Sequence, residues 1–175
     1  MSKVLIVVDM QNDFIDGALG TPEAVAIKPR VHKKVEEYRA NLDTVVFTRD
    51  THFINYSKTL EGKHLPIPHC IAATHGWKIT PGLFDEDYDL IIQKHSFGYS
   101  GWDEGCYGLD EAESIELVGL CTDICVVSNA LILKALYPET EIYVDASCCA
   151  GTTPENHKAA LQVMKSCQIN VIGEN

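Results

Sequence analysis

The sequence has little positive charge and no cluster of basic residues. It carries 14 Lys and Arg residues against 25 Asp and Glu residues, which gives a formal net charge of −11 at pH 7. Binding to phosphate backbones or to anionic membrane surfaces needs clustered cationic side chains. We therefore expect neither a nucleic acid nor a membrane as a partner, and we interpret the acidic excess as a source of solubility.

Long hydrophobic runs, internal repeats and low-complexity tracts are also missing. Near the N-terminus only five consecutive apolar residues, at positions 4–8, precede Asp9, and this run is too short for a secretion signal. No run approaches the length that crosses a bilayer. With 175 residues, of which 46% are hydrophobic, the chain suits one domain, residues 1–175, with a sizeable core.

The seven cysteines lack the spacing of a zinc-ribbon motif or of a regular disulfide framework; they stand at positions 70, 106, 121, 125, 148, 149 and 167. Cys121 and Cys125 are one residue too far apart for a thioredoxin-type redox motif. We therefore expect reduced cysteines and a cytoplasmic protein.

Short apolar runs alternate with amphipathic segments along the chain. We expect strands at residues 4–8, 44–48, 90–93, 115–120, 141–144 and 168–172. We expect helices at 29–42, at 124–136 and from Pro154 onward, with Thr153 as the N-cap of the last. Pro29 suits the first turn of the first helix, and residues 53–87 read as a long, ordered loop. The alternation predicts an α/β fold with a doubly wound, mostly parallel six-stranded sheet and helices on both faces.

Ionisable or nucleophilic residues follow each of the first four expected strands. They are Asp9, Asp50 with His52, Lys94 and Cys125. Each has an ordinary explanation when it is taken alone, because Asp often caps a turn and Lys often ends a strand at the surface. Ligands of parallel sheets bind outside the carboxyl ends of the strands, so four such groups at one edge indicate an active site.

The segment around Cys125 has the pattern of a strand, a sharp polar turn and a helix. Cys125 falls in the first helical turn, where unpaired N–H groups and the positive end of the helix dipole favour a thiolate. The same N–H groups could hold a developing oxyanion. A buried, inert cysteine that packs as a small hydrophobic side chain is the alternative for this stretch alone.

Four motifs together resemble the nicotinamidase and isochorismatase-like cysteine hydrolases. They are Val7-Val-Asp-Met-Gln-Asn-Asp-Phe14, Thr48-Arg-Asp-Thr-His52, Lys94 and Gly119-Leu-Cys-Thr-Asp-Ile-Cys-Val126, and the resemblance spans essentially the whole chain. It implies an isochorismatase-like fold and a catalytic triad of Asp9, Lys94 and Cys125. Cys125 would form a thioester with the substrate, Asp9 would move the protons, and Lys94 would hold their charges.

The resemblance also implies an oxyanion hole made of backbone N–H groups. In this sequence those groups belong to Cys121 and Cys125. The turn of the family usually contains a non-proline cis peptide bond, which we expect between Leu120 and Cys121.

Asp50, His52 and His69 resemble the metal site of nicotinamidases. Glu61, nine residues after His52, is our candidate for a fourth ligand. The implied cofactor is a divalent metal, with Zn²⁺ as the first choice and Mn²⁺ or Fe²⁺ permitted by the same ligand types. By resemblance the ion would bind the pyridine nitrogen of nicotinamide and so position the carboxamide over Cys125.

Aromatic residues are expected to stack on the substrate ring. Phe14 and one of the aromatics between positions 97 and 102, namely Phe97, Tyr99 or Trp102, are the candidates, and ordinary core packing is the alternative for each. Pro66 stands where some family members have an aromatic residue. The shape of the pocket is therefore less determined than its chemistry.

The resulting hypothesis is hydrolysis of nicotinamide to nicotinate and ammonia in NAD salvage, with pyrazinamide as a further substrate. We also expect a homo-oligomer. Two alternatives remain open: a metal-free relative that acts on another small amide or on isochorismate, and a hydrolase fold that has lost catalysis and serves binding. The candidate metal ligands argue against the first, and the intact triad argues against the second.

Overall fold

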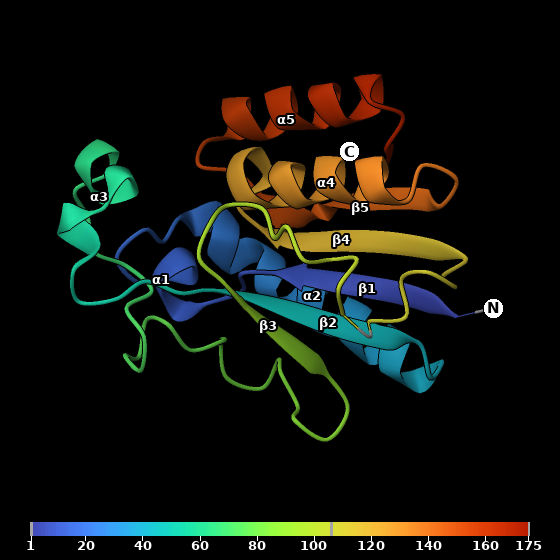
Figure 1. Cartoon of the computed structure of the whole chain (residues 1–175), viewed down its shortest axis with the longest axis horizontal. Coiled ribbons are helices and arrows are strands. Elements are labelled where there is room, and N and C mark those ends of the chain that lie inside the picture. The colour runs from blue at the N-terminus through green and yellow to red at the C-terminus, as the bar shows by residue number, and fades with distance from the viewer. Residues whose placement is uncertain (1, 106, 175) are drawn as a thin grey trace.

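The computed structural model describes residues 2–105 and 107–174, so Cys106 lies outside the described residues, and it has a parallel sheet at its centre (Figure 1). The strands are β1 (Lys3–Val8), β2 (Thr44–Asp50), β3 (Leu90–Lys94), β4 (Ser114–Leu120), β5 (Glu141–Ala150) and β6 (Asn170–Ile172). They lie in the order β3-β2-β1-β4-β5-β6, and every neighbouring pair is parallel. The predicted doubly wound, six-stranded sheet is confirmed.

Helices cover both faces of this sheet, as Figure 1 shows. Helix α2 (Pro22–Ala40) lies on one face, and α4 (Val127–Leu136) and α5 (Pro154–Ser166) lie on the other. Shorter elements gather near the carboxyl ends of the strands: α1 (Asn12–Ile15), the 3₁₀ turn η1 (Tyr56–Lys58), α3 (Leu60–His64) and the π-helical turn η2 (Thr122–Val126). The segment that we expected to be an ordered loop therefore contains η1 and α3.

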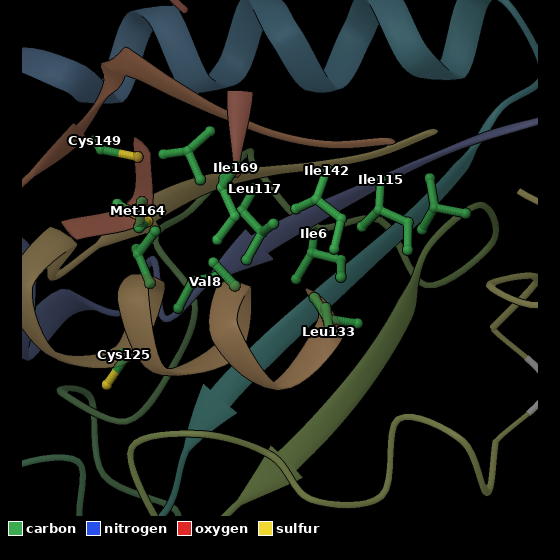
Figure 2. Close-up of a cluster of buried hydrophobic side chains, with 14 of the residues drawn as sticks. Ile6, Val8, Ile115, Leu117, Cys125, Leu133, Ile142, Cys149, Met164 and Ile169 are labelled. Atoms are coloured by element: carbon green, nitrogen blue, oxygen red, sulfur yellow. The ribbon is translucent and has the colours of Figure 1, made fainter. Parts of the chain in front are cut away.

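Strand β1 is buried on both faces, which explains its continuous apolar run. Its even-numbered residues, such as Ile6, belong to the core under α4 and α5, whereas Leu5 and Val7 belong to the core under α2. Figure 2 shows the first of these cores, in which Leu133 of α4 and Met164 of α5 lie beside strand residues. Such two-sided burial is the reason that parallel strands lack alternating polarity.

The first long helix begins at Pro22, so the predicted start at Pro29 is wrong. Thr21 is its N-cap and accepts a hydrogen bond of 3.0 Å from the N–H of Ala24. Pro22 occupies the first helical turn, and Pro29 lies inside the helix. Proline has no N–H, so the carbonyl of Val25, four residues earlier, lacks its helical hydrogen bond. The side chain of Val25 is half exposed, so the missing bond falls on the solvent side of the helix.

Strand β5 is longer than predicted and β6 is shorter. β5 continues to Ala150, so Cys148 and Cys149 lie in the strand and not in a loop after it. The register between β4 and β5 shifts after Leu117, and Cys149 pairs with Gly119 beyond the shift. A bulge of this kind hides the end of a strand from pattern analysis, because it breaks the alternation of faces.

Gly119 allows β4 to approach β1 at this point. Its φ is +116°, and a Cβ atom there would overlap the carbonyl oxygen of Val8. We predict that Gly119→Ala lowers the free energy of unfolding by about 3 kcal/mol or more, because it adds a backbone clash to an unfavourable φ. Equilibrium denaturation in urea would measure the change.

Gly82→Ala is the matched control for this prediction. Gly82 also has a positive φ, of +80°, but no atom lies within 4 Å of a Cβ built there. Gly82→Ala should therefore lower the free energy of unfolding only by the cost of the unfavourable φ, about 1 kcal/mol. Equal losses in the two variants would contradict the idea that close strand approach requires Gly119.

Candidate active site

The sheet brings the four groups predicted at its strand ends into one place. Asp9 follows β1 and Cys125 follows β4, and the order of the strands reverses between these two neighbours. Lys94 is the last residue of β3 and pairs in register with Asp50, the last residue of β2. The candidate site thus occupies the topological switch point, where α/β sheets usually bind ligands.

Lys94 lies at the centre of the candidate triad. Its Nζ is 2.6 Å from Asp9 Oδ2 and 3.5 Å from Cys125 Sγ. All three side chains are buried. Asp9 also lies near enough to the thiol of Cys125 to raise its pKa. A carboxylate, an ammonium and a thiol in mutual contact can pass a proton while an ion pair keeps the charges balanced.

The backbone of Asp9 has an unusual conformation. Its φ is 47°, in the left-handed region that side-chain-bearing residues seldom adopt. Thr48 of β2 holds the residue in place, because its hydroxyl donates to Asp9 Oδ1 at 2.7 Å and accepts from the N–H of Asp9 at 3.2 Å. Sequence analysis missed this role of Thr48, although the residue opens the motif that contains Asp50 and His52. Strain at such a position commonly marks a functional residue.

Cys125 lies in a π-helical turn, whereas we had expected an ordinary α-helix from residue 124. Within η2 the N–H of Val126 bonds to the carbonyl of Cys121, five residues earlier, at 3.1 Å, and α4 begins after this turn. π-helical turns recur at functional sites. The Leu120–Cys121 peptide bond is cis, as the family resemblance implied.

The electrostatic surroundings of the thiol differ from our expectation. Burial raises the pKa of Cys125 well above its usual range, and the charge of Asp9 adds to this effect more than Lys94 opposes it. The helix end therefore does not yield a resting thiolate. Burial is the largest single influence and would lower the pKa of Lys94, but Asp9 and the other acidic groups around it together raise that pKa, so the ammonium stays charged. Burial also raises the pKa of Asp9, which suits a group that accepts a proton.

Asp50, His52, His69 and Glu61 surround one point beside the triad. His52 Nε2 lies 3.0 Å from Asp50 Oδ2 and 3.4 Å from Glu61 Oε1. His69 Nε2 lies 3.8 Å and 3.6 Å from the same two oxygens. A tetrahedral Zn²⁺ site with bonds of about 2.1 Å separates its ligand atoms by about 3.4 Å. The ligand atoms of Asp50, His52 and His69 all lie within 4.8 Å of one another and therefore match the size of such a site, whereas Glu61 lies beside the two histidines and stays a candidate fourth ligand.

Two features of the histidines point to a cation. His69 Nδ1 donates to the carbonyl of Ile67 at 2.8 Å, which leaves a lone pair on Nε2 facing the cluster. His52 Nε2 is buried and has no hydrogen bond of good geometry within residues 2–105 and 107–174. Burial would lower the pKa of His52, but Asp50 and Glu61 raise it to about 9, so the cluster favours positive charge. A divalent metal fits this set of ligands.

One cavity of about 330 Å³ is lined both by the candidate nucleophile and by candidate metal ligands. Its lining includes Cys121 and Cys125 as well as Asp50, Glu61 and His69. The remaining lining is mostly apolar: Phe14, Leu19, Thr21, Ala24, Leu65, Phe97, Leu120, Ile124, Gly151 and Thr152. A small, flat, largely apolar ligand with one polar group at each end suits such a cavity.

Of the expected aromatic contacts, the structure brings two to the cavity. Phe14 lies with its ring centre 5.5 Å from that of His69, and Phe97 also lines the cavity. Trp102 is fully buried in the core, and Tyr99 packs edge-on against it at 5.3 Å. Neither of these two lines the cavity, so core packing accounts for both.

Gln11 is a further residue that sequence analysis missed. Its buried amide donates to the carbonyl of Asp50 at 2.8 Å and accepts from the N–H of Asp50 at 2.7 Å. A second bond, of 2.9 Å, reaches the carbonyl of Trp77. Gln11 thereby ties Asp50, at the end of β2, to the loop that carries Asp9. Its place in the Asp9 motif was a signal of importance but not of this contact.

Known proteins with similar sequences and folds include several amide hydrolases. The nicotinamidase/pyrazinamidase of Mycobacterium tuberculosis (strain ATCC 25618 / H37Rv) is 27% identical over 187 residues, which cover 97% of this chain and 98% of the relative. The pyrazinamidase of Pyrococcus horikoshii, solved in complex with zinc, is 30% identical, with a TM-score of 0.82 and coverage of 99% and 100%. N-carbamoylsarcosine amidase of Thermoplasma acidophilum is 27% identical, with a TM-score of 0.82 and coverage of 98% and 95%.

The isochorismatase domain, as a protein family, matches residues 3–175 of the sequence. This match spans all six strands and every residue of the candidate site. The chain belongs to the isochorismatase family.

Proposed function

We propose that this chain, a hydrolase of the isochorismatase family, is a metal-containing nicotinamidase that converts nicotinamide and water to nicotinate and ammonia. The observation that carries the proposal is the single cavity lined by both the Cys125 thiol and the Asp50–Glu61–His69 side of the metal cluster. Nicotinamide has a carboxamide at one end and a ring nitrogen at the other. The relatives from M. tuberculosis and P. horikoshii support the same assignment.

Substrate binding would use both ends of the cavity. Asp50, His52, His69 and Glu61 would hold the divalent ion, which supplies a Lewis-acid site for the ring nitrogen. Phe14 and Phe97 line the apolar part between the two ends and would pack on the ring. This arrangement would place the carboxamide carbon next to the sulfur of Cys125.

The first half of the reaction would form a thioester. Asp9 takes the proton of the Cys125 thiol as the sulfur attacks the carboxamide carbon, and the N–H groups of Cys121 and Cys125 stabilise the oxyanion. Asp9 then passes that proton to the amine, the C–N bond breaks and ammonia leaves. Because the thiol is neutral at rest, its negative charge arises only during attack, next to the ammonium of Lys94.

The second half would return the enzyme to its starting state. Asp9 takes a proton from a water molecule, and the resulting hydroxide attacks the thioester carbon. The C–S bond breaks, the sulfur recovers a proton from Asp9, and nicotinate leaves. Lys94 remains charged throughout, so the buried carboxylate of Asp9 always has a counter-charge beside it.

The wider assignment follows from the same chemistry. Pyrazinamide presents an equivalent ring nitrogen and carboxamide, so we propose it as a second substrate, and nicotinate release would serve NAD salvage. Across residues 2–105 and 107–174, no helix is both long and apolar enough to cross a membrane. A cytoplasmic location, a homo-oligomeric state and Zn²⁺ as the metal stay predictions.

A second candidate is a metal-independent amidase that acts on another small amide. The similarity to N-carbamoylsarcosine amidase favours the other substrate in this candidate, because that relative has an equal TM-score and is named for a different amide. Metal analysis of the purified protein and ammonia release from nicotinamide, with and without a chelator, separate the two. A metal-free protein that releases no ammonia from nicotinamide would favour the second candidate.

Substitution of the nucleophile gives the first prediction for this site. Cys125→Ala should abolish turnover of nicotinamide while leaving its binding constant within about threefold, because the ring contacts remain. Cys125→Ser should be nearly as inactive, since Asp9 cannot readily deprotonate a hydroxyl. Ammonia release and calorimetric titration would measure the two effects. Cys167→Ala, at an exposed cysteine, is the control, and a Cys125→Ala enzyme with substantial activity would refute the role.

The metal ligands give the second prediction. His52→Ala should lose the metal and raise KM for nicotinamide about tenfold or more, because a ligand of the ring-binding ion is gone. Wild-type protein should prefer nicotinamide to benzamide, which lacks the ring nitrogen, and the variant should discriminate little. The ratio of kcat/KM for the two amides measures this directly.

His75→Ala is the matched control, because His75 is exposed and lies outside the cluster. It should keep both the metal content and the substrate ratio of the wild type. If His52→Ala left the ratio unchanged, the ion would have no part in orienting the ring.

A further inference from the structure

Asn129 is a fully buried amide one helical turn after the candidate nucleophile. Its Nδ2 donates to the carbonyls of Cys125 at 2.8 Å and of Phe97 at 3.2 Å. Its Oδ1 accepts from the N–H of Tyr99 at 2.9 Å and from Trp102 Nε1 at 3.0 Å. The amide has two donor hydrogens and two acceptor lone pairs, so these four bonds use its whole capacity.

The loop that these bonds reach lies directly on α4. A Cβ atom at Gly98 would overlap the side chain of Ile132 and contact Ser128 at 3.4 Å. Farther along the helix, the hydroxyl of Tyr137 donates to the carbonyl of Trp102 at 3.2 Å. The loop therefore takes its position from α4, the same helix that follows the nucleophile.

Asn129 also supports the π-helical turn that carries Cys125. Ser128 and Asn129, consecutive residues of α4, donate from their side chains to the carbonyls of Ile124 at 2.6 Å and Cys125 at 2.8 Å. Figure 2 shows Cys125 at the end of the helix nearest this turn. One NH₂ group thus binds the backbone of two residues, Cys125 and Phe97, that line the same cavity.

We propose that Asn129 is a positioning residue, which sets the distance between the sulfur of Cys125 and the ring of Phe97. It touches neither the substrate nor the reacting atoms, and acts through the two backbones that it joins. The proposal rests on the proposed function for the nature of the bound ring. An aromatic amide then meets the nucleophile at a distance that Asn129 fixes, which makes this residue a determinant of specificity for flat rings.

Asn129→Ser should remove the bonds from residue 129 to the loop while it keeps a bond to the turn that carries Cys125. A serine hydroxyl can donate to the carbonyl four residues earlier, as Ser128 does, but it is too short to reach the loop. We expect KM for nicotinamide to rise about tenfold and kcat to change by less than about threefold, because loop bonds are lost while the turn keeps its support. Steady-state kinetics would measure both constants.

Tyr137→Phe is the matched control. It removes a different hydrogen bond between α4 and the same loop, at a distance from the cavity. It should lower the melting temperature less than Asn129→Ser, because it removes one hydrogen bond where the serine variant removes three, and it should leave KM unchanged. If Asn129→Ser lowered the melting temperature but also left KM unchanged, the role of Asn129 would be structural only and the proposal would fail.

Alkylation of Cys125 tests the proposal without any turnover. Iodoacetamide alkylates the thiol without an aromatic group that could contact the cavity wall. Iodoacetanilide alkylates it in the same way but carries a phenyl ring that would contact Phe97. We expect Asn129→Ser and Phe97→Ala each to lower the ratio of the iodoacetanilide rate to the iodoacetamide rate at Cys125 by about fivefold, as measured by peptide mapping. This ratio remains decisive even if the wild-type protein does not hydrolyse nicotinamide, an outcome that would overturn only the proposed function.

A double variant shows whether Asn129 acts through Phe97. In the Phe97→Ala background, Asn129→Ser should change the alkylation ratio no further, because the ring that it positions is absent. Additive effects would overturn the proposal. If Asn129→Ser does not fold, Asn129→Asp replaces it, since aspartate has the shape of the amide and keeps the acceptor for Tyr99 and Trp102 but loses the donor; an unchanged ratio there would likewise refute the proposal.

Discussion

The pairing of one buried ammonium with two buried carboxylates constrains this whole sheet edge. Lys94 has no exposed side-chain surface, and it contacts Asp9 at 2.6 Å and Asp50 at 3.5 Å. A buried charge without a partner costs several kcal/mol, so the three groups must be brought together by the fold. The parallel register does so, because β1, β2 and β3 end side by side.

The same contact links the two chemical sites. Asp9 belongs to the proposed triad, Asp50 belongs to the candidate metal ligands, and Lys94 contacts both. A cation bound at Asp50 would therefore act on the charge balance of Lys94 and Asp9 as well as on the position of the ring. Gln11 strengthens the link mechanically, since its amide ties Asp50 to the loop that starts at Asp9.

Much of the fold and the membership of the site were predictable, because both follow from features that a sequence displays. Apolar runs indicated the strands, and the polar segments just beyond them contained Asp9, Asp50, Lys94 and Cys125. Features that depend on packing were not predictable. The burial of Trp102 requires knowledge of which loop lies on α4, and the high pKa of Cys125 results from burial that the helix-end argument leaves out. Thr48 was overlooked because its neighbour in space, Asp9, decides its role, whereas Pro29 was misread because the local Thr21–Pro22 cap was passed over.

The left-handed backbone of Asp9 has an evolutionary consequence. At a φ of 47° a glycine would be less strained than an aspartate. Removal of the buried carboxylate would also remove the free-energy cost of taking its charge out of water. Such a change is nevertheless blocked, because it would leave Lys94 buried without its nearest counter-charge. A lineage released from selection for this chemistry should therefore lose Asp9 and Lys94 together, so that paired loss of these residues becomes the genetic signature of a retired enzyme.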